Sequence, residues 1–188
     1  MPTTKPDRLH FTGNDAADEL LAREPFALLV GFALDQQVPV PTAFSGPLKI
    51  EQRLGTIDAA KLARLEPAKL EAAFRAKPAV HRFPGTMAER VHELAQHVAD
   101  EYDGDAERLW ADANGTDDLR ARIAALPGFG EMKIKALGAV LAKRFGVRAA
   151  EGLVPSHPTL GDVDSVEALH TYQGWKREYK AKQKQKRA

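Results

Sequence analysis

Hydrophobic positions recur along this chain mostly at spacings of three and four, which is the period of an amphipathic helix. The clearest stripe runs through residues 86–102, where Thr86 and Glu89 also have the spacing of a helix capping box. Residues 25–37 are apolar on nearly every side, so they predict a buried central helix that ends at Pro39 and Pro41. Because β-branched residues do not alternate in runs, the pattern predicts an all-α fold without a sheet.

Turn and cap residues separate the other helical segments. The pattern predicts shorter helices over residues 14–23, 47–54, 58–65, 67–76, 105–113, 117–125 (with Thr116 as N-cap) and 131–145. Residues 146–164 have no period and predict a loop. A last amphipathic helix is expected over residues 165–182, and the basic residues after it are expected to lose helical structure.

Two of these segments form a helical hairpin. Leu119, Ile123 and Leu126 make an apolar seam before a Pro/Gly turn at residues 126–130, and a matching seam follows at Ile134, Leu137, Leu141 and Phe145. Gly128 and Gly130 can adopt positive φ and admit a close backbone approach. They leave bare N–H groups at a helix N-terminus, which attract anions, and Lys133 and Lys135 follow within a turn. The hairpin therefore predicts contacts to DNA phosphates.

The charge is unevenly distributed. Residues 176–188 carry seven Lys/Arg and one Glu, a net charge of +6, while the rest of the chain carries 20 basic and 25 acidic residues. Such a tail is a common device for binding phosphates without sequence preference, although a solvated helix end would have the same composition.

Composition also excludes several classes of function. The chain has no cysteine, which rules out disulfides, thiolate nucleophiles and cysteine-held zinc or iron–sulfur clusters. The six histidines are scattered, so neither a metal nor another cofactor is expected. No apolar run approaches the roughly 20 residues of a membrane span. We therefore expect a monomeric cytoplasmic, nucleoid-associated protein without membrane contact, whose partner is double-stranded DNA.

Three segments in order resemble the helix-hairpin-helix DNA glycosylases of the HhH-GPD group. The resemblance covers about residues 25–146. Residues 28–37 resemble the first core helix, which ends here in Asp35-Gln36-Gln37. Residues 82–94 resemble the segment ahead of the family's long helix, and residues 126–130 are the hairpin itself. The resemblance implies a two-lobed helical fold with a cleft into which a damaged nucleotide is rotated. Residues 25–146 would form the core, residues 1–24 and 147–182 a second lobe, and residues 183–188 a tail.

By the same resemblance, Gln37 enters the gap that a flipped base leaves in the stack. The alternative is that Gln36 and Gln37 cap a helix end before Pro39. Phe44, Trp110, Tyr172 and Trp175 could stack a flipped base, although packing explains each of them better.

Two departures from the family bear on the chemistry. Met132 stands where bifunctional members place a lysine that forms an imine, and Lys133 is one position, about 100°, further round a helix. Ser156 stands where the catalytic aspartate is expected. Asp35, Asp162 and Asp164 are the candidate acids that could replace it, and Asp35 sits at a helix C-terminus, where a carboxylate is disfavoured unless it has another role.

Three functions remain open. The leading expectation is a monofunctional DNA N-glycosylase of base excision repair, a hydrolase without lyase activity. Its substrates would include alkylated bases, because a cationic purine leaves without strong help from a carboxylate. The alternative is a non-catalytic DNA-binding protein that retains the glycosylase scaffold. A helical protein-interaction module is the third, and the hairpin and the tail favour the first two.

Overall fold

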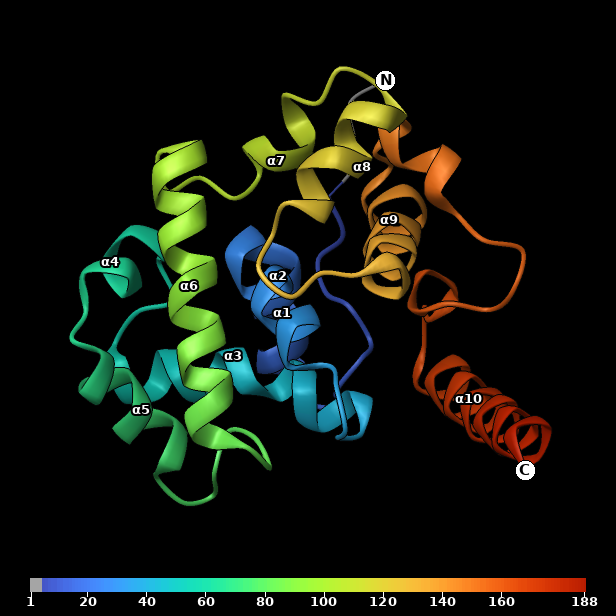
Figure 1. Ribbon diagram of the computed structural model, residues 1–188, viewed down its shortest axis with the longest axis horizontal. Coiled ribbons are helices and arrows are strands. Elements are labelled where there is room, and N and C mark those ends of the chain that lie inside the picture. The colour runs from blue at the N-terminus through green and yellow to red at the C-terminus, as the bar shows by residue number, and fades with distance from the viewer. Residues whose placement is uncertain (1–4) are drawn as a thin grey trace.

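The computed structural model describes residues 5–188, and its regular elements there are all helices (Figure 1). The α-helices are α1 (Asp15–Arg23), α2 (Pro25–Leu34), α3 (Val40–Leu54), α4 (Ala59–Arg64), α5 (Pro67–Arg75), α6 (Pro84–Tyr102), α7 (Arg108–Ala111), α8 (Thr116–Ala124), α9 (Glu131–Phe145) and α10 (Val166–Arg187). Two 3-10 helices, η1 (Arg148–Leu153) and η2 (Leu160–Asp162), lie between α9 and α10. No strand occurs within residues 5–188, so the predicted all-α fold is confirmed.

The core is built around α2. Its residues from Phe26 to Leu34 are buried, and the helix packs against α1, α3 and α6. A helix that is apolar on every side has to be surrounded, so the predicted buried central helix is confirmed. It ends at Leu34, three residues before the predicted end at Gln37.

The prolines after α2 begin a helix instead of enforcing an extended segment. Pro39 is the N-cap of α3, and Pro41 lies in its first turn, where a backbone N–H has no helical acceptor and its loss costs nothing. The helix continues through Pro47 to Leu54. The prediction of a short helix over residues 47–54 was therefore wrong, because that segment is the second half of α3.

Two predicted caps were also wrong. Helix α6 begins at Pro84 with Phe83 as its N-cap, so Thr86 lies inside the first turn and forms no capping box. Helix α8 begins at Thr116 itself, and Gly115 is the N-cap. In the first case a proline at N1 fixes the start of the helix before a threonine can cap it.

The C-terminal third has more helix than the pattern predicted. Residues 146–164, expected to be a loop, contain η1 and η2, which both pack against α9. Helix α10 runs on to Arg187, through the basic tail that was expected to be non-helical. Lysine, arginine and glutamine are good helix formers, and cations at a helix C-terminus are stabilised by its dipole.

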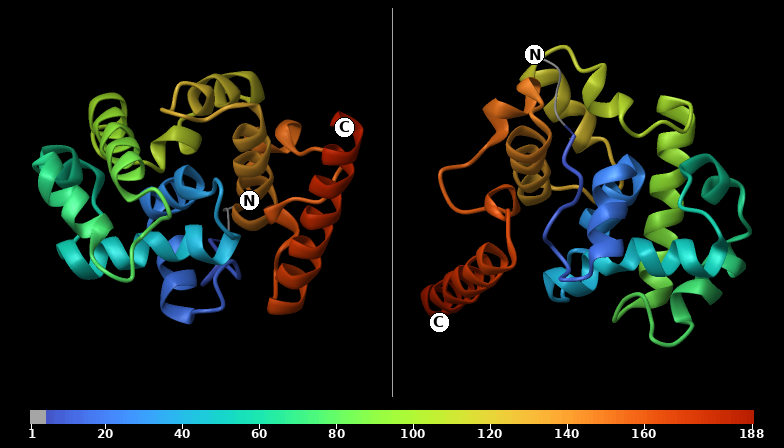
Figure 2. Two further views of the ribbon diagram at one scale, coloured as in Figure 1. Left: turned by 60° about the horizontal axis from the view of Figure 1, so that its bottom comes forward. Right: turned by 180° about the vertical axis from the view of Figure 1, so that it is seen from behind.

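Helix α10 stands at the edge of the molecule in Figure 1 and in both views of Figure 2. It packs against η2, whereas α1 packs against α2 and α3. The grouping of residues 1–24 with 147–182 as a second lobe stays a prediction. Across the part of the chain that the structure describes, no helix is both long enough and apolar enough to traverse a bilayer.

Candidate functional site

The predicted hairpin is present. Helices α8 and α9 pack against each other, and both predicted apolar seams are buried. The turn between them is closed by the N–H of Phe129, which donates to the carbonyl of Leu126 at 3.1 Å. Helix α9 begins after Gly130, which has no side chain to cap the helix, so the first N–H groups of α9 are left without a side-chain acceptor. This is the geometry that attracts an anion to a helix N-terminus.

The two glycines of the turn differ in conformation. Gly128 has φ of 77°, as predicted, and a Cβ there would overlap the guanidinium of Arg90. Gly130 has φ of −92°, so the expectation of positive φ at this position was wrong. A Cβ at Gly130 would meet no other atom within 4 Å. Gly128 is required by the backbone, whereas Gly130 leaves open space in front of the helix end.

Charged groups surround this helix end. Glu131, in the first turn, accepts a 2.6 Å hydrogen bond from Arg120 and lies 3.9 Å from the amine of Lys135. Arg90 reaches the turn from α6 and lies against Gly128, a contact that no local sequence pattern predicts. Lys135, Arg120 and Arg90 thus keep the hairpin cationic despite Glu131.

Lys133 points away from the exposed surface of the hairpin. Its Nζ donates a 3.1 Å hydrogen bond to the carbonyl of Ala33 in the last turn of α2, and it lies 5.5 Å from the centre of the Phe129 ring. Burial lowers the pKa of Lys133 to about 8, helped by nearby Arg90 and opposed by Asp35. The amine therefore joins α9 to the end of α2, where the carbonyls of the helix end attract a cation.

Asp35 follows directly, as the C-cap of α2. Its side chain is only 14% exposed, and a carboxylate oxygen lies 3.9 Å from the amine of Lys176 on α10. Burial raises the pKa of Asp35, while Lys176, Lys133 and Lys180 act against that rise. Two forces thus compete at this carboxyl: desolvation, which favours the neutral acid, and three ammonium groups, which favour the ion. The result is an acid at the junction of α2, α9 and α10 whose charge depends on its cationic neighbours.

Tyr172 closes the junction from the side of α10. Burial and the nearby Asp35 together raise the pKa of the Tyr172 phenol to about 12. The amine of Lys176 lies 6.0 Å from the centre of its ring. The phenol therefore stays neutral at physiological pH and can donate a hydrogen bond.

The turn that carries Asp35 is held by a histidine that the sequence analysis did not single out. His81 is buried, and its Nε2 lies 3.1 Å from the carbonyl oxygen of Leu34 and 3.0 Å from that of Gln36. Its Nδ1 accepts from the N–H of Phe83, so the ring must be the neutral tautomer with its proton on Nε2. Burial lowers the pKa of His81, which favours that form. No helical period marks this position, which explains why it was missed.

The two glutamines after Asp35 have different environments. The side-chain amide of Gln36 donates to the carbonyl of Ala33 at 3.1 Å, so the capping alternative applies to Gln36. Gln37 is exposed and has φ of 58°, an uncommon conformation for a residue with a side chain. Such strain persists only where the surrounding structure imposes it, and it often accompanies a binding role. Insertion of Gln37 into DNA stays a prediction.

The other candidate acids lie elsewhere. Asp162 accepts hydrogen bonds from Lys143 and from the N–H of Thr159, and it completes a capping box with Thr159 at the start of η2. Although burial raises the pKa of Asp162, these hydrogen bonds outweigh it and lower the pKa overall. Asp164 and Ser156 are exposed. Asp162 thus has a structural role, and Asp35 is the candidate acid that lies among buried cations.

The aromatic candidates divide into two pairs. Phe44 is fully buried and packs edge-on against Phe11 and Phe32, and Trp110 is buried, so packing accounts for both. Tyr172 and Trp175 lie on α10 with their ring planes 29° apart and their centres 6.1 Å apart.

Comparison with known proteins agrees with this geometry. The family model described as "HhH-GPD superfamily base excision DNA repair protein" matches residues 30–188, which is 159 of the 188 residues. No curated protein and no solved structure matches significantly. Because the matched region includes the hairpin, the Asp35 turn and α10, the chain belongs to the HhH-GPD superfamily of base excision DNA repair proteins.

Proposed function

We propose that this chain is a DNA N-glycosylase that excises damaged bases and that Asp35 is its catalytic carboxylate. The observation that carries the proposal is the placement of Asp35, buried at the junction of α2, α9 and α10 with Lys176 at 3.9 Å. A carboxylate at the C-terminal end of a helix is disfavoured by the helix dipole. A largely buried carboxyl at this position, with cations from two other helices beside it, is typical of a functional site.

The proposed chemistry follows from charge. Breaking the bond between a base and its sugar builds positive charge on the sugar, and a nearby carboxylate stabilises that charge. Asp35 must be ionised for this purpose. Burial raises the pKa of Asp35, and Lys176 and Lys133 counteract part of that rise by favouring the ionised form. His81 acts as a positioning residue, because it holds the carbonyls on either side of Asp35.

We further propose that the enzyme is monofunctional. Met132, at the position of the family's imine-forming lysine, carries no amine and is 81% exposed. The expected product is then a free base and an intact strand with an abasic site. Alkylated purines are the proposed substrates, because three ammonium groups weaken the help that Asp35 can give and a cationic base leaves most easily.

One observation favours a second activity. The amine of Lys133 lies at the Asp35 junction, and with a pKa of about 8 roughly a tenth of it is neutral at pH 7. A neutral amine can attack the C1′ aldehyde of an abasic site, with loss of water to form an imine. Lys133 would then support strand cleavage from one position beyond Met132.

The decisive experiment measures single-turnover base release from duplexes carrying alkylated, deaminated or oxidised bases, with alkali used to reveal abasic sites. We expect Asp35→Asn to slow excision about 10²–10³-fold, the usual cost of losing one well-placed charge, while duplex affinity is retained. Asp164→Asn is the matched control and should leave excision unchanged. Tight binding without excision over the whole panel would instead favour a non-catalytic DNA-binding protein.

Borohydride separates the two activities. The monofunctional enzyme gives no trapped complex with abasic DNA, whereas attack by Lys133 gives one that disappears in Lys133→Gln. Met132→Lys is the positive control for trapping, because it places an amine at an exposed position of α9, the helix that carries Lys133.

A further inference from the structure

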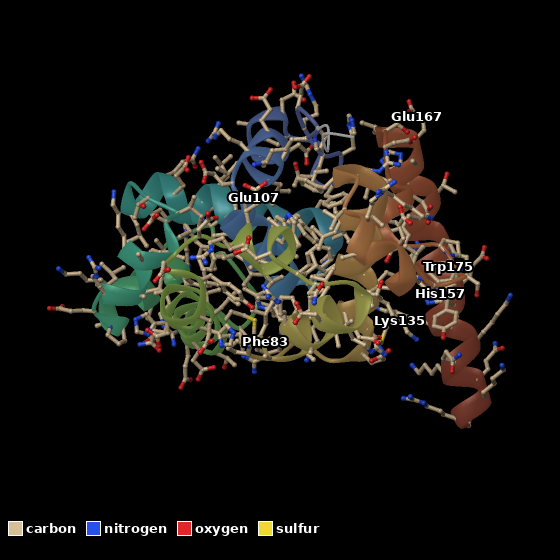
Figure 3. The ribbon with its side chains drawn as sticks, turned by 90° about the horizontal axis from the view of Figure 1, so that it is seen from above. Phe83, Glu107, Lys135, His157, Glu167 and Trp175 are labelled. Atoms are coloured by element: carbon tan, nitrogen blue, oxygen red, sulfur yellow. The ribbon has the colours of Figure 1, made fainter. Side chains whose placement is uncertain are left out.

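Three aromatic rings, Tyr172, Trp175 and Tyr179, form a row along α10, and His157, from the segment between η1 and η2, stacks on the middle ring. Trp175 lies nearly parallel to His157, with an interplanar angle of 11° and a centroid distance of 5.7 Å, and Figure 3 shows these two side chains together. Trp175 is also stacked with Tyr179 at 5.2 Å and with Tyr172 at 6.1 Å. The edge-on ring pairs of the core differ from this arrangement, since Phe32 and Phe44 are at 90°. The rings of the row therefore lie roughly parallel to one another along one helix.

The core covers this helix face only at Tyr172, which packs against it, and at Lys176, which lies beside Asp35. Tyr172, Trp175 and Tyr179 are spaced three and four residues apart, and Lys176 and Lys180 lie on the same face. In a packed helix such a face would be apolar and buried. Here Leu169 is the one buried residue of α10, Trp175 is partly exposed, and Tyr179 is 44% exposed. The rings after Tyr172 are thus accessible to a partner.

Cations are interleaved with the rings. Residues 176–188 have a net charge of +6. Lys176 lies 6.0 Å from the centre of the Tyr172 ring and 3.9 Å from Asp35, so it connects the aromatic row to the proposed catalytic acid. Lys180 is also close enough to influence the Asp35 carboxyl. One face of α10 therefore combines aromatic planes and ammonium groups and leads to Asp35.

We propose that this face of α10 binds single-stranded DNA, with unpaired bases stacked on the aromatic row and phosphates bound by Lys176 and Lys180. Every base has a flat π-face, so a row of rings accepts any sequence, and lysines beside the row match the charge of the backbone. Bases inside a duplex are stacked on one another and cannot use the rings. An acidic peptide would satisfy the lysines but would leave the ring faces unused.

This surface differs from the hairpin, which is predicted to contact phosphates of a duplex. It goes beyond the proposed glycosylase activity, because it names a partner strand and does not need Asp35 to be catalytic. Binding of an undamaged single-stranded oligonucleotide to this face involves no base excision. A chain that proves to be inactive as a glycosylase could therefore still bind the strand, and the two proposals fail separately.

The experiment uses two probes of equal length and charge: a 16-nucleotide oligo(dT) and a strand of tetrahydrofuran phosphates, which has neither bases nor the reactive C1′ aldehyde of an abasic site. Trp110→Phe leaves Trp175 as the sole tryptophan, so its fluorescence reports on the row. We expect oligo(dT) to quench Trp175 and to bind about tenfold more tightly than the base-free strand, as base–aromatic stacking predicts. Equal affinities for the two probes without quenching would overturn the proposal.

Anisotropy of labelled probes then assigns the residues in the full-length protein. Trp175→Ala and Tyr179→Ala should each lower oligo(dT) affinity about tenfold and leave the base-free strand unaffected, while Trp175→Phe keeps most of the binding. Lys180→Gln should weaken both probes equally. His170→Ala removes an exposed ring of the same helix outside the row and should change neither. Because Tyr179 is exposed, its variant stays folded, and unchanged oligo(dT) affinity there would rule the row out.

Discussion

The guanidinium of Arg90 occupies the space that a Cβ of Gly128 would fill, so the turn of the hairpin is matched to a glycine by both its backbone and its neighbour. With φ of 77°, residue 128 also lies in the left-handed region. Because the turn has no side chain at residue 128, the guanidinium of Arg90 from α6 can lie there.

Gly128→Ala should weaken duplex binding about equally for all sequences. The new Cβ displaces Arg90, and the left-handed backbone destabilises the protein by about 1–2 kcal/mol. Filter binding or anisotropy with several unrelated duplexes measures the loss, and circular dichroism checks the fold. Gly130→Ala is the matched comparison, because its backbone is unstrained and its Cβ meets open space. If Gly130→Ala lowers the affinity for duplex DNA without lowering the stability of the protein, the DNA approaches the N-terminus of α9 closely. A folded Gly128→Ala with normal affinity would exclude the hairpin as the binding site.

His81 should make stability fall as the pH becomes acidic. Its pKa is lowered by burial from the ordinary 6.5, so the unfolded chain takes up this proton first. The stabilisation is complete above about pH 6.5 and is lost as the pH falls through the folded-state pKa. Chemical denaturation at pH 7.5 and pH 5 measures it. His81→Ala should cost about 1–3 kcal/mol at pH 7.5, because buried carbonyls lose their donor, and less at pH 5. The exposed His170→Ala should show no such difference.

Lys133 should make stability rise in alkaline solution. Its pKa is lowered from 10.5 to about 8, so the unfolded chain holds this proton over a range in which the folded chain has released it. The free energy of unfolding is therefore expected to increase between about pH 8 and pH 10.5. Lys133→Met, which keeps the length of the side chain without the charge, should remove that increase. Lys135→Met is the control, and an increase equal in all three proteins would show that Lys133 is not its source.

The basic end of α10 should set much of the salt dependence of DNA binding. Removal of residues 180–188 deletes five cations, Lys180, Lys182, Lys184, Lys186 and Arg187. If each neutralises a phosphate, the slope of log K against log salt should shrink by roughly four to five. A full-length variant with glutamine at the five positions keeps the helix and should give the same change. An unchanged slope in both proteins would show that this end does not contact DNA.

The sequence predicted the elements whose pattern depends on local spacing. The buried seams of α8 and α9, the all-apolar α2 and the Gly128 turn follow from periodicity and from the need of a tight turn for glycine. The helix starts at Val40 and Pro84 did not follow, because a proline can end one helix or begin the next and only the tertiary structure decides.

The candidate site was predictable only in part. Asp35 was named because a carboxylate is misplaced at a helix end, and the structure places it among cations. Three contacts join residues that are 38–100 positions apart in the sequence. They are those of Lys133 with Ala33, Arg90 with Gly128 and His81 with Gln36. No local pattern records such contacts. Asp162 was a candidate acid like Asp35, but its carboxylate accepts hydrogen bonds from Lys143 and from the N–H of Thr159.

Helix α10 has a single buried residue, and this affects its local stability and the substitutions that it tolerates. Leu169 fixes the first turns of the helix, and little of the remaining length contributes to the core. Backbone amides beyond Tyr172 can therefore exchange their hydrogens through local opening that costs far less than global unfolding. Substitutions beyond Tyr172 should therefore change the free energy of unfolding little. The residues that we propose to contact nucleic acid at this end of the chain can therefore vary while the rest of the molecule keeps its structure.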